Sequence, residues 1–275
     1  LRRFHIAQPE PMTDVFSFQA GDSPLLISVP HDGCHLPADI RDQMTPAGLA
    51  LPDTDWHVAE LYGFARERGA SMLVANYSRY VIDLNRPASD EALYPGQVAT
   101  GLCPLQTFAG DDIYLSPAIH ADELQRRVTN FWQPYHDQIT NVIQAMRDKY
   151  GYALLWDAHS ISSVVPRLFD GELPELNLGT DGGRSCSKEI EVAVAAAMDS
   201  SHYQSVLNGR FQGGFITRHY GDPGKHVHAV QLELAQRVYM DESTGMYDTA
   251  KASLLRYNLG TMLDEFVESA ERLIL

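Results

Sequence analysis

Short apolar runs alternate with longer stretches of helical periodicity along most of this chain, and this alternation limits the possible folds more than any other feature. The apolar runs cover residues 24–30, 71–74, 80–84, 152–156 and 228–234. Runs of this length between turn residues are typical of buried strands. Helical patterns cover 54–68, 118–150, 187–198 and 249–275. Strands separated by helices predict a three-layer α/β/α fold.

Two long segments, 88–116 and 168–184, are rich in Gly and Pro and lack periodicity. We expect both to be loops, and loops of this length inside a domain are often functional. The composition does not shift along the 275 residues. The sequence therefore predicts a single domain over residues 1–275.

The charge balance narrows the classes of partner. The chain has 21 Lys and Arg against 36 Asp and Glu, a formal net charge of −15. This argues against nucleic acid, whose recognition draws on excess Lys and Arg, and no basic amphipathic stretch indicates a membrane surface. No apolar run reaches the roughly 20 residues of a membrane span. Three widely spaced cysteines without a CxxC pair favour a reducing compartment, so we expect a cytoplasmic protein.

Polar side chains follow the predicted strands, where ligands bind in α/β folds. His31 follows the run 24–30, and His159 follows 152–156. Two imidazoles and one carboxylate leave one coordination position open, the usual arrangement at catalytic zinc. Each histidine could instead be a hydrogen-bonded structural residue. The carboxylate could come from Asp32, Asp53 or Asp55, of which Asp55 is expected in the first turn of the helix over 54–68.

Five further residues invite a functional interpretation. Glu233 lies between two leucines of a predicted buried strand, where a charge is costly unless it is paired or near a metal. Asp157 either orients His159 or stabilises the turn after the strand. Arg79 and the pair Asn85-Arg86 flank the run 80–84 and could bind a carboxylate or form surface ion pairs.

Several common motifs are absent. The chain contains no GxxxxGK[ST], GxGxxG or GxSxG sequence, which argues against a nucleotide phosphate loop and a serine hydrolase. Cys34 lies near His31 and His35, but a small buried thiol explains it better than a nucleophile does.

Eight motifs along the chain together resemble one family. They are SVPHDG, LPDTDWHV, SRYVIDLNRP, LYPGQVATGLCP, LLWDAHSI, LNLGTDGG, GGFITRHYGDP and VHAVQLELAQRVYMDE, spread over residues 25–242. Together they resemble the N-formylglutamate amidohydrolase (N-formylglutamate deformylase) family of histidine degradation. That family is similar to the zinc carboxypeptidase and aspartoacylase group. The resemblance implies a mixed, mostly parallel sheet between helices, of the zinc-carboxypeptidase-like (phosphorylase/hydrolase-like) type, with one metal at the strand ends.

The resemblance also implies metal ligands. His31 and His159 match the two metal-binding histidines of the wider group. That group has a Glu three residues after the first histidine, whereas this chain has Cys34 there. We therefore expect Asp55 to supply the missing carboxylate, with Asp53 as the second choice. Zn²⁺ is the expected ion, and another divalent metal would satisfy the same residues.

Other residues match the group by position. Glu233 matches its general base. Arg79 matches an arginine that stabilises the developing oxyanion, and Asn85 and Arg86 match the pair that holds a substrate carboxylate. We expect Arg218 to hold the second carboxylate of a dicarboxylate substrate.

The implied reaction is metal-dependent hydrolysis of N-formyl-L-glutamate to formate and L-glutamate. Two enzymatic alternatives are a deacylase of another N-acyl amino acid and a small-peptide carboxypeptidase. A third alternative is a non-catalytic metal- or ligand-binding protein on the same fold. Convergence of Glu233 with the two histidines would argue against the last of these, and a cavity with little depth beyond the metal would favour a formyl group. The oligomeric state is left open.

Overall fold

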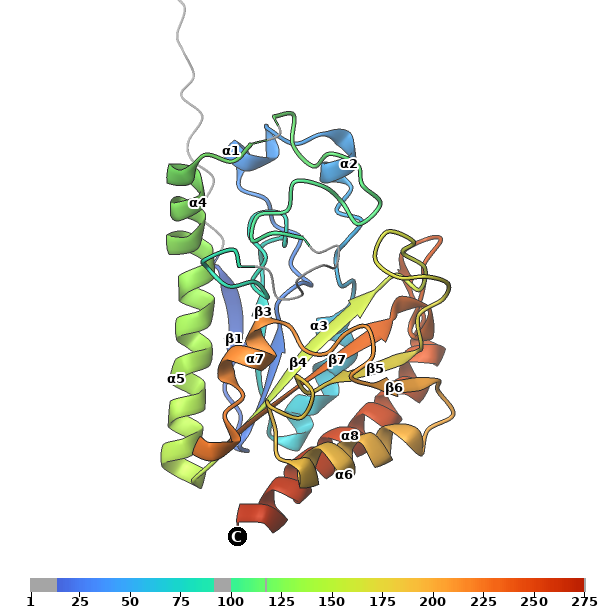
Figure 1. Cartoon of the computed structure of the whole chain (residues 1–275). Helices are drawn as coiled ribbons and strands as arrows, with labels where there is room; N and C mark the ends of the chain where they lie inside the picture. The colour runs from blue at the N-terminus through green and yellow to red at the C-terminus, as the bar shows by residue number, and fades with distance from the viewer. Residues whose placement is uncertain (1–13, 92–99, 117, 275) are drawn as a thin grey trace, which may run out of the picture.

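The apolar runs assemble into one seven-stranded sheet in the computed structural model, which describes residues 14–91, 100–116 and 118–274 (Figure 1). The strand order is β1-β3-β2-β4-β7-β5-β6. The strands are β1 (Phe16–Gln19), β2 (Leu25–Val29), β3 (Ser71–Ala75), β4 (Ala153–Ile161), β5 (Leu176–Gly179), β6 (Ser205–Leu207) and β7 (Val227–Ala235).

The sheet is mixed and mostly parallel. Strands β3, β2, β4 and β7 run parallel to one another and form its centre. At one edge β1 is antiparallel to β3, and on the other side β5 is antiparallel to β7 and parallel to β6. The carboxyl ends of the four central strands therefore meet at one edge of the sheet, as the predicted fold class requires.

Helices cover both faces of the sheet, so the predicted three layers are confirmed (Figure 1). On one face lie α3 (Val58–Leu61), α6 (Lys188–Asp199) and α8 (Thr249–Ile274). On the other lie α4 (Ala121–Arg127), α5 (Gln133–Tyr150) and α7 (Phe215–Tyr220). Side chains alternate between the faces along each strand. In β4, Trp156 packs toward α8, whereas Leu155 packs toward α5.

Most predicted elements are confirmed. The runs 24–30, 71–74, 152–156 and 228–234 lie in β2, β3, β4 and β7, and 187–198 and 249–275 correspond to α6 and α8. The predicted helix over 118–150 consists of α4, a π-helical turn over Val128–Trp132, and α5. The remaining short elements are α1 (Ala38–Arg41), α2 (Pro46–Leu49), the hairpin β8 (Met240–Asp241) and β9 (Met246–Tyr247), and 3-10 turns at Tyr62–Arg68, Pro223–Lys225 and Gln236–Val238.

The prediction of a strand over 80–84 is wrong. This buried segment forms successive turns and pairs with no strand. Its short apolar run is typical of a buried strand, but Asp83 accepts a hydrogen bond from the backbone N–H of Asn85 and closes a turn there (2.9 Å). Its carbonyl groups are bonded by side chains of other segments instead of by a neighbouring strand.

Three other boundaries differ from the prediction. The helix over 54–68 begins only at Val58 and continues as a 3-10 turn after Leu61. The predicted loop over 168–184 contains β5, and the sequence patterns missed β1, β6 and α7. The described residues of the 88–116 segment form turns and isolated bridges, and residues 92–99, with much of the LYPGQVATGLCP motif, lie outside the described part. Within the described ranges, none of the helices combines the length and the apolar character needed to cross a bilayer.

Candidate active site

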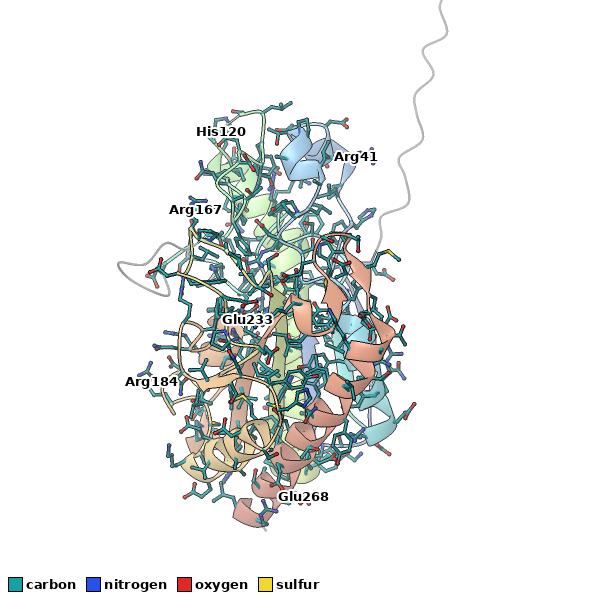
Figure 2. All side chains as sticks on the ribbon, turned by 90° about the vertical axis from the view of Figure 1, so that its right-hand side faces the viewer. Arg41, His120, Arg167, Arg184, Glu233 and Glu268 are labelled. Atoms are coloured by element: carbon teal, nitrogen blue, oxygen red, sulfur yellow. The ribbon has the colours of Figure 1, made fainter. Side chains whose placement is uncertain are left out.

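Three central strands deliver the predicted residues to one place. His31 follows β2, His159 lies near the end of β4, and Glu233 lies near the end of β7. His159 and Glu233 are paired in the β4–β7 register, so they project from the same face of the sheet. The two leucines beside Glu233 project into the opposite core against α6 and α8. Figure 2 shows Glu233 in the interior of the molecule.

His31, Asp55 and His159 form a buried group whose ligand atoms all lie within 4.8 Å of one another. Asp55 Oδ2 lies 3.0 Å from His159 Nδ1 and 3.8 Å from His31 Nδ1. The structure thus brings together the three residues that the sequence proposed as metal ligands. Two imidazole nitrogens and a carboxylate are the donor set of many catalytic zinc sites.

A carboxylate contacts the Nε2 atom of each histidine, on the side of the ring away from Asp55. Asp83 Oδ1 lies 2.8 Å from His31 Nε2, and Asp157 Oδ2 lies 2.9 Å from His159 Nε2. Each pair fixes the ring orientation and leaves Nδ1 directed at Asp55, which is how carboxylates commonly orient metal-binding histidines. The group therefore fits a divalent metal. Sequence reasoning considered Asp157 for this role but missed Asp83, because it assigned 80–84 to a strand.

Asp55 reaches the group from the segment that precedes α3. The prediction that it lies in the first helical turn is wrong, because α3 begins at Val58. Its backbone N–H donates to the His31 carbonyl (3.1 Å), and its Oδ2 accepts from the Ser160 N–H (3.0 Å). Burial opposes ionisation of Asp55, but hydrogen bonds from His159 and His31 outweigh it and hold its pKa well below the usual value.

Asp53, the second choice as ligand, points elsewhere. Its Oδ2 accepts hydrogen bonds from the Tyr80 hydroxyl (2.6 Å) and the Phe108 N–H (2.8 Å). Burial raises the pKa of this carboxyl group, against the effect of these bonds. Asp53 therefore links the segments that carry Tyr80 and Phe108 and lies outside the His-Asp-His group.

Arg79 lies among acidic groups and lines a small cavity next to the His-Asp-His group. Its Nη2 donates to Asp83 Oδ2 (2.7 Å), and its Nη1 lies 3.5 Å from Asp55 Oδ1. Its guanidinium carbon lies 4.9 Å from the centre of the Phe108 ring. The buried Nε atom has no hydrogen-bond partner among the described residues. This buried donor of the guanidinium group is therefore unpartnered among the described residues.

Asn85 and Arg86 both line the cavity, and their side chains are held differently. The Asn85 amide donates to Asp157 Oδ2 (3.2 Å) and lies 2.9 Å from His159 Nε2. Arg86 uses Nε and Nη2 to bond the backbone and hydroxyl of Thr100 (2.9 and 3.0 Å). Its Nη1 also donates to the Asn85 carbonyl (2.9 Å), so the described residues take up three of its five N–H groups.

Arg218 does not join the other predicted residues. Its Nε donates to the Gly213 carbonyl (2.7 Å), and its Nη1 lies 3.3 Å from Asp181 Oδ1. Among the described residues, it lines neither the cavity at the His-Asp-His group nor the neighbouring one. No pattern in the sequence indicates where the Arg218 side chain lies. The expectation that it holds a carboxylate rests on the family's substrate alone.

Glu233 has the environment of a group that exchanges a proton near neutral pH. Burial raises its pKa to about 8, while the charge of nearby His159 opposes the shift. Its Oε2 lies 3.4 Å from Gln231 Nε2. The other side of the Gln231 amide accepts from the backbone N–H of Gly214 (2.6 Å), so the side chain beside Glu233 is itself fixed.

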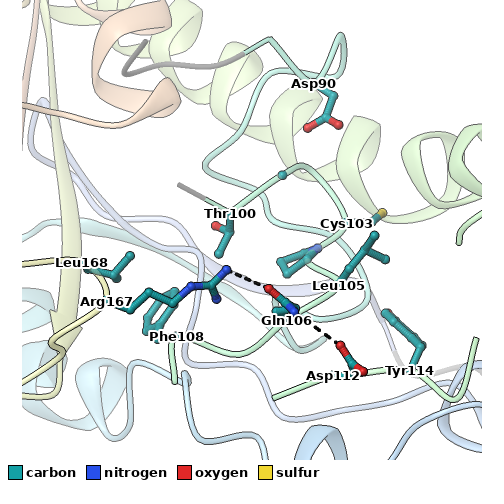
Figure 3. A pocket seen from close by; sticks show the side chains of 12 residues that line it. Asp90, Thr100, Cys103, Leu105, Gln106, Phe108, Asp112, Tyr114, Arg167 and Leu168 are labelled. Carbon is teal, nitrogen blue, oxygen red and sulfur yellow. Dashed lines mark hydrogen bonds between the residues drawn. The ribbon is translucent and has the colours of Figure 1, made fainter. Parts of the chain in front are cut away.

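The His-Asp-His group, Glu233, Arg79 and Arg86 line one cavity of about 70 Å³. Phe108 and Leu168 form part of its wall and also part of the wall of a larger cavity of about 400 Å³ (Figure 3). In the larger cavity Arg167 Nη2 donates to Gln106 Oε1 (2.8 Å). The small cavity thus holds the reactive groups, and the larger one adjoins it.

An α/β fold with buried histidines, carboxylates and a glutamate of raised pKa at the carboxyl end of its sheet is typical of enzymes that use acid–base chemistry. The model of the N-formylglutamate amidohydrolase family matches residues 23–240. The chain belongs to this family, as the eight motifs predicted.

The similar proteins are consistent with this membership. The chain is 50% identical over 236 residues to a Pseudomonas putida protein named N-formylglutamate deformylase, covering 84% of this chain and 87% of that one. It is 52% identical over 238 residues to a Pseudomonas aeruginosa protein of the same name, with the same coverage. The crystal structure of N-formylglutamate amidohydrolase from Ralstonia eutropha shares the fold, with a TM-score of 0.81 at 22% identity over 95% of this chain and all of that one.

Proposed function

We propose that this chain hydrolyses N-formyl-L-glutamate to formate and L-glutamate in a metal-dependent reaction. The observation that carries the proposal is that Glu233 and the His31–Asp55–His159 group line the same small cavity. The two relatives named N-formylglutamate deformylase support the choice of substrate. Zn²⁺ as the particular metal and a role in histidine degradation are part of the proposal and rest on the family resemblance.

His31, Asp55 and His159 would hold the metal, with Asp83 and Asp157 fixing the two rings. The bound metal would supply Lewis-acid chemistry, which lowers the pKa of water and polarises a carbonyl group. The donor set and the carboxylates that contact the two rings support this assignment.

We propose one catalytic domain for the chain, since the two largest hydrophobic cores flank the same sheet.

Glu233 acts as the general base and acid in this proposal. It takes a proton from the attacking water as the water oxygen bonds to the formyl carbon. It then delivers that proton to the amide nitrogen as the C–N bond breaks, which releases formate and the amine of L-glutamate. Its burial beside His159 supports this role, because a carboxylate that binds a proton near neutral pH transfers it efficiently.

Arg79 donates a hydrogen bond to the oxyanion that develops on the formyl oxygen. Its unpartnered Nε and its place at the cavity wall support this role. The remaining N–H groups of Arg86 hold a substrate carboxylate. Asn85 keeps the Asp157–His159 pair aligned through its amide. The role of Arg218 in holding the second carboxylate stays a prediction, and its side chain bonds Gly213 and Asp181.

The size of the cavity favours a small acyl group. A volume of about 70 Å³ accommodates a formyl group near the metal and leaves little room for a longer acyl chain. We propose that the glutamate part of the substrate extends past Phe108 and Leu168 toward the larger cavity.

The test combines metal analysis of the purified protein with assays on three substrates. We expect about one divalent metal per chain and formate release from N-formyl-L-glutamate, with N-acetyl- and N-succinyl-L-glutamate hydrolysed at least roughly 100-fold more slowly, the discrimination that a close-fitting pocket achieves. His31→Ala should lose both the metal and turnover. Full metal occupancy in that variant would refute the ligand assignment, and faster hydrolysis of a longer acyl group would refute the substrate.

A further inference from the structure

The irregular segment from Tyr80 to Arg86 carries much of the site but belongs to no strand. Its Asp83 bonds His31, its Asn85 bonds the Asp157–His159 pair, and Arg86 lines the cavity. A segment without strand neighbours needs other partners for its buried carbonyl groups. The identity of those partners shows what holds these side chains in place.

Three of these partners come from the long helix that runs beside the sheet as α4 and α5 (Figure 1). Arg127 Nη1 donates to the Val81 carbonyl, His136 Nε2 to the Leu84 carbonyl, and Trp132 Nε1 to the Arg86 carbonyl, each at 2.9 Å. All three side chains are buried. The last two bonds lie on either side of Asn85.

The π-helical turn over Val128–Trp132 explains how one helix presents these three donors on one side. In an unbroken α-helix, residues advance by roughly 100° each, so Arg127 and Trp132 would point about 140° apart. A π turn, with its i→i+5 bond, brings residues five apart nearly above one another. His136 then follows Trp132 by one α-helical turn, so the irregular turn aligns Arg127, Trp132 and His136.

His136 is held in the orientation that this contact requires. Its ring stacks on Trp132 with the centroids 3.8 Å apart, and its Nδ1 lies 2.9 Å from the Tyr220 hydroxyl. The Leu84 carbonyl only accepts, so Nε2 carries a ring proton and donates to it, while the Tyr220 hydroxyl also donates to the His136 carbonyl (3.1 Å). On the other side of Asn85, a Cβ at Gly214 would lie 2.3 Å from the Asn85 amide nitrogen, so only glycine permits this approach.

We propose that Trp132 and His136 are positioning residues that fix the Asn85-Arg86 segment and thereby set the affinity for the substrate's carboxylate. This inference rests on the proposed function, in which Arg86 binds that carboxylate. Neither side chain touches the cavity, so each acts through the backbone carbonyl on its side of Asn85.

Trp132→Phe removes the N–H donor and keeps most of the ring. We expect KM for N-formyl-L-glutamate to rise roughly 3- to 10-fold, the scale of one hydrogen bond, with kcat changed less than about twofold. L-Glutamate should also raise the melting temperature of this variant less than that of the wild type. The matched control is Trp156→Phe, because the Trp156 N–H is also buried but donates to the Tyr62 hydroxyl (3.0 Å) in the opposite core. That control should keep the wild-type KM.

His136 provides an independent rescue test. Gln retains an N–H donor at about the position of Nε2, so His136→Gln should keep KM within about twofold of the wild type, whereas His136→Leu should raise it as Trp132→Phe does. Equal KM values in Trp132→Phe and Trp156→Phe, with an active wild type, would overturn the inference. A wild type that releases no formate from N-formyl-L-glutamate would instead refute the proposed function.

Discussion

Glu233 lies in register with His159 on the neighbouring parallel strands β7 and β4, so a buried carboxylate stands next to a buried imidazole on one face of the sheet. Leu232 and Leu234, on either side of Glu233, point into the opposite core. The carboxyl group is therefore tolerated in this strand because its side chain faces polar groups, while its neighbours stabilise the strand. This pairing supports acid–base chemistry at Glu233.

Glu233→Gln should leave the metal bound and lower kcat about 10²- to 10⁴-fold. Gln keeps the shape of the side chain but cannot accept a proton, and this range is the usual contribution of acid–base catalysis. The measurement is formate release per folded molecule together with metal content. Glu191→Gln is the matched control, because Glu191 is a buried carboxylate that bonds Thr180 and Lys188 outside both cavities. A Glu233→Gln protein with wild-type turnover and reduced stability would show that the carboxylate is structural.

Asp83→Asn should weaken metal binding roughly 10- to 100-fold, the usual effect of losing a carboxylate behind a metal-binding histidine. Asn no longer offers His31 Nε2 a charged acceptor, so the ring is less firmly oriented and its other nitrogen is a weaker ligand. Competition with a chelator of known affinity measures the change. Asp264→Asn, which removes the partner of Arg68 at the surface, serves as the control and should bind metal like the wild type. An unchanged affinity in Asp83→Asn would mean that Asp83 acts only on Arg79.

The sequence could predict the central strands and the two histidines, because these depend on local periodicity and on where strands end. His31, His159 and Glu233 each follow or lie within an apolar run that the sheet buries on both faces. The role of Asp83 could not be predicted in this way. The segment around it has the composition of a strand, and side chains far away in the sequence hold it in another conformation, Tyr114, Trp132 and His136 among them.

Arg86→Ala should act on substrate binding more than on the chemical step. A charged hydrogen bond to a carboxylate contributes about 1.5–3 kcal/mol, so KM should rise roughly 10- to 100-fold while kcat changes little. Steady-state kinetics on N-formyl-L-glutamate measure both constants. Arg86→Lys tests whether charge alone is enough, because Lys lacks the planar fork that also bonds Thr100. A fall in kcat at unchanged KM would assign Arg86 to the transition state instead.

Arg79→Ala should lower kcat more than it changes KM, the reverse of the effect expected for Arg86→Ala. If its Nε meets the developing oxyanion, kcat should fall about 10²- to 10³-fold, the effect of removing one oxyanion donor. The variant also leaves Asp83 without its charged partner, so some loss of stability is expected as well. Kinetics per folded molecule, with the folded fraction measured by circular dichroism, separate the two effects. A variant that raises only KM would show that Arg79 binds the substrate in its ground state.

His136 should make the stability of the protein depend on pH below neutrality. Burial lowers its pKa to about 3, against the hydrogen bond to Leu84, whereas the unfolded chain has the ordinary value of about 6.5. The titratable side chains around it are Tyr135 of its own helix and His219 and Tyr220 of α7, and both tyrosine pKa values are raised.

Between pH 6.5 and 3 the unfolded chain therefore binds a proton at His136 that the native protein excludes. The unfolding free energy then rises with pH across this window, by up to about 1.4 kcal/mol per unit, and the full contribution is present above pH 6.5. His136→Gln removes this titration and keeps the donor to Leu84. Urea unfolding at pH 7 and pH 5 should show that the wild type loses about 2 kcal/mol more than His136→Gln on acidification. Equal losses in the two proteins would mean that the native protein binds a proton at His136 over this pH range as readily as the unfolded chain does.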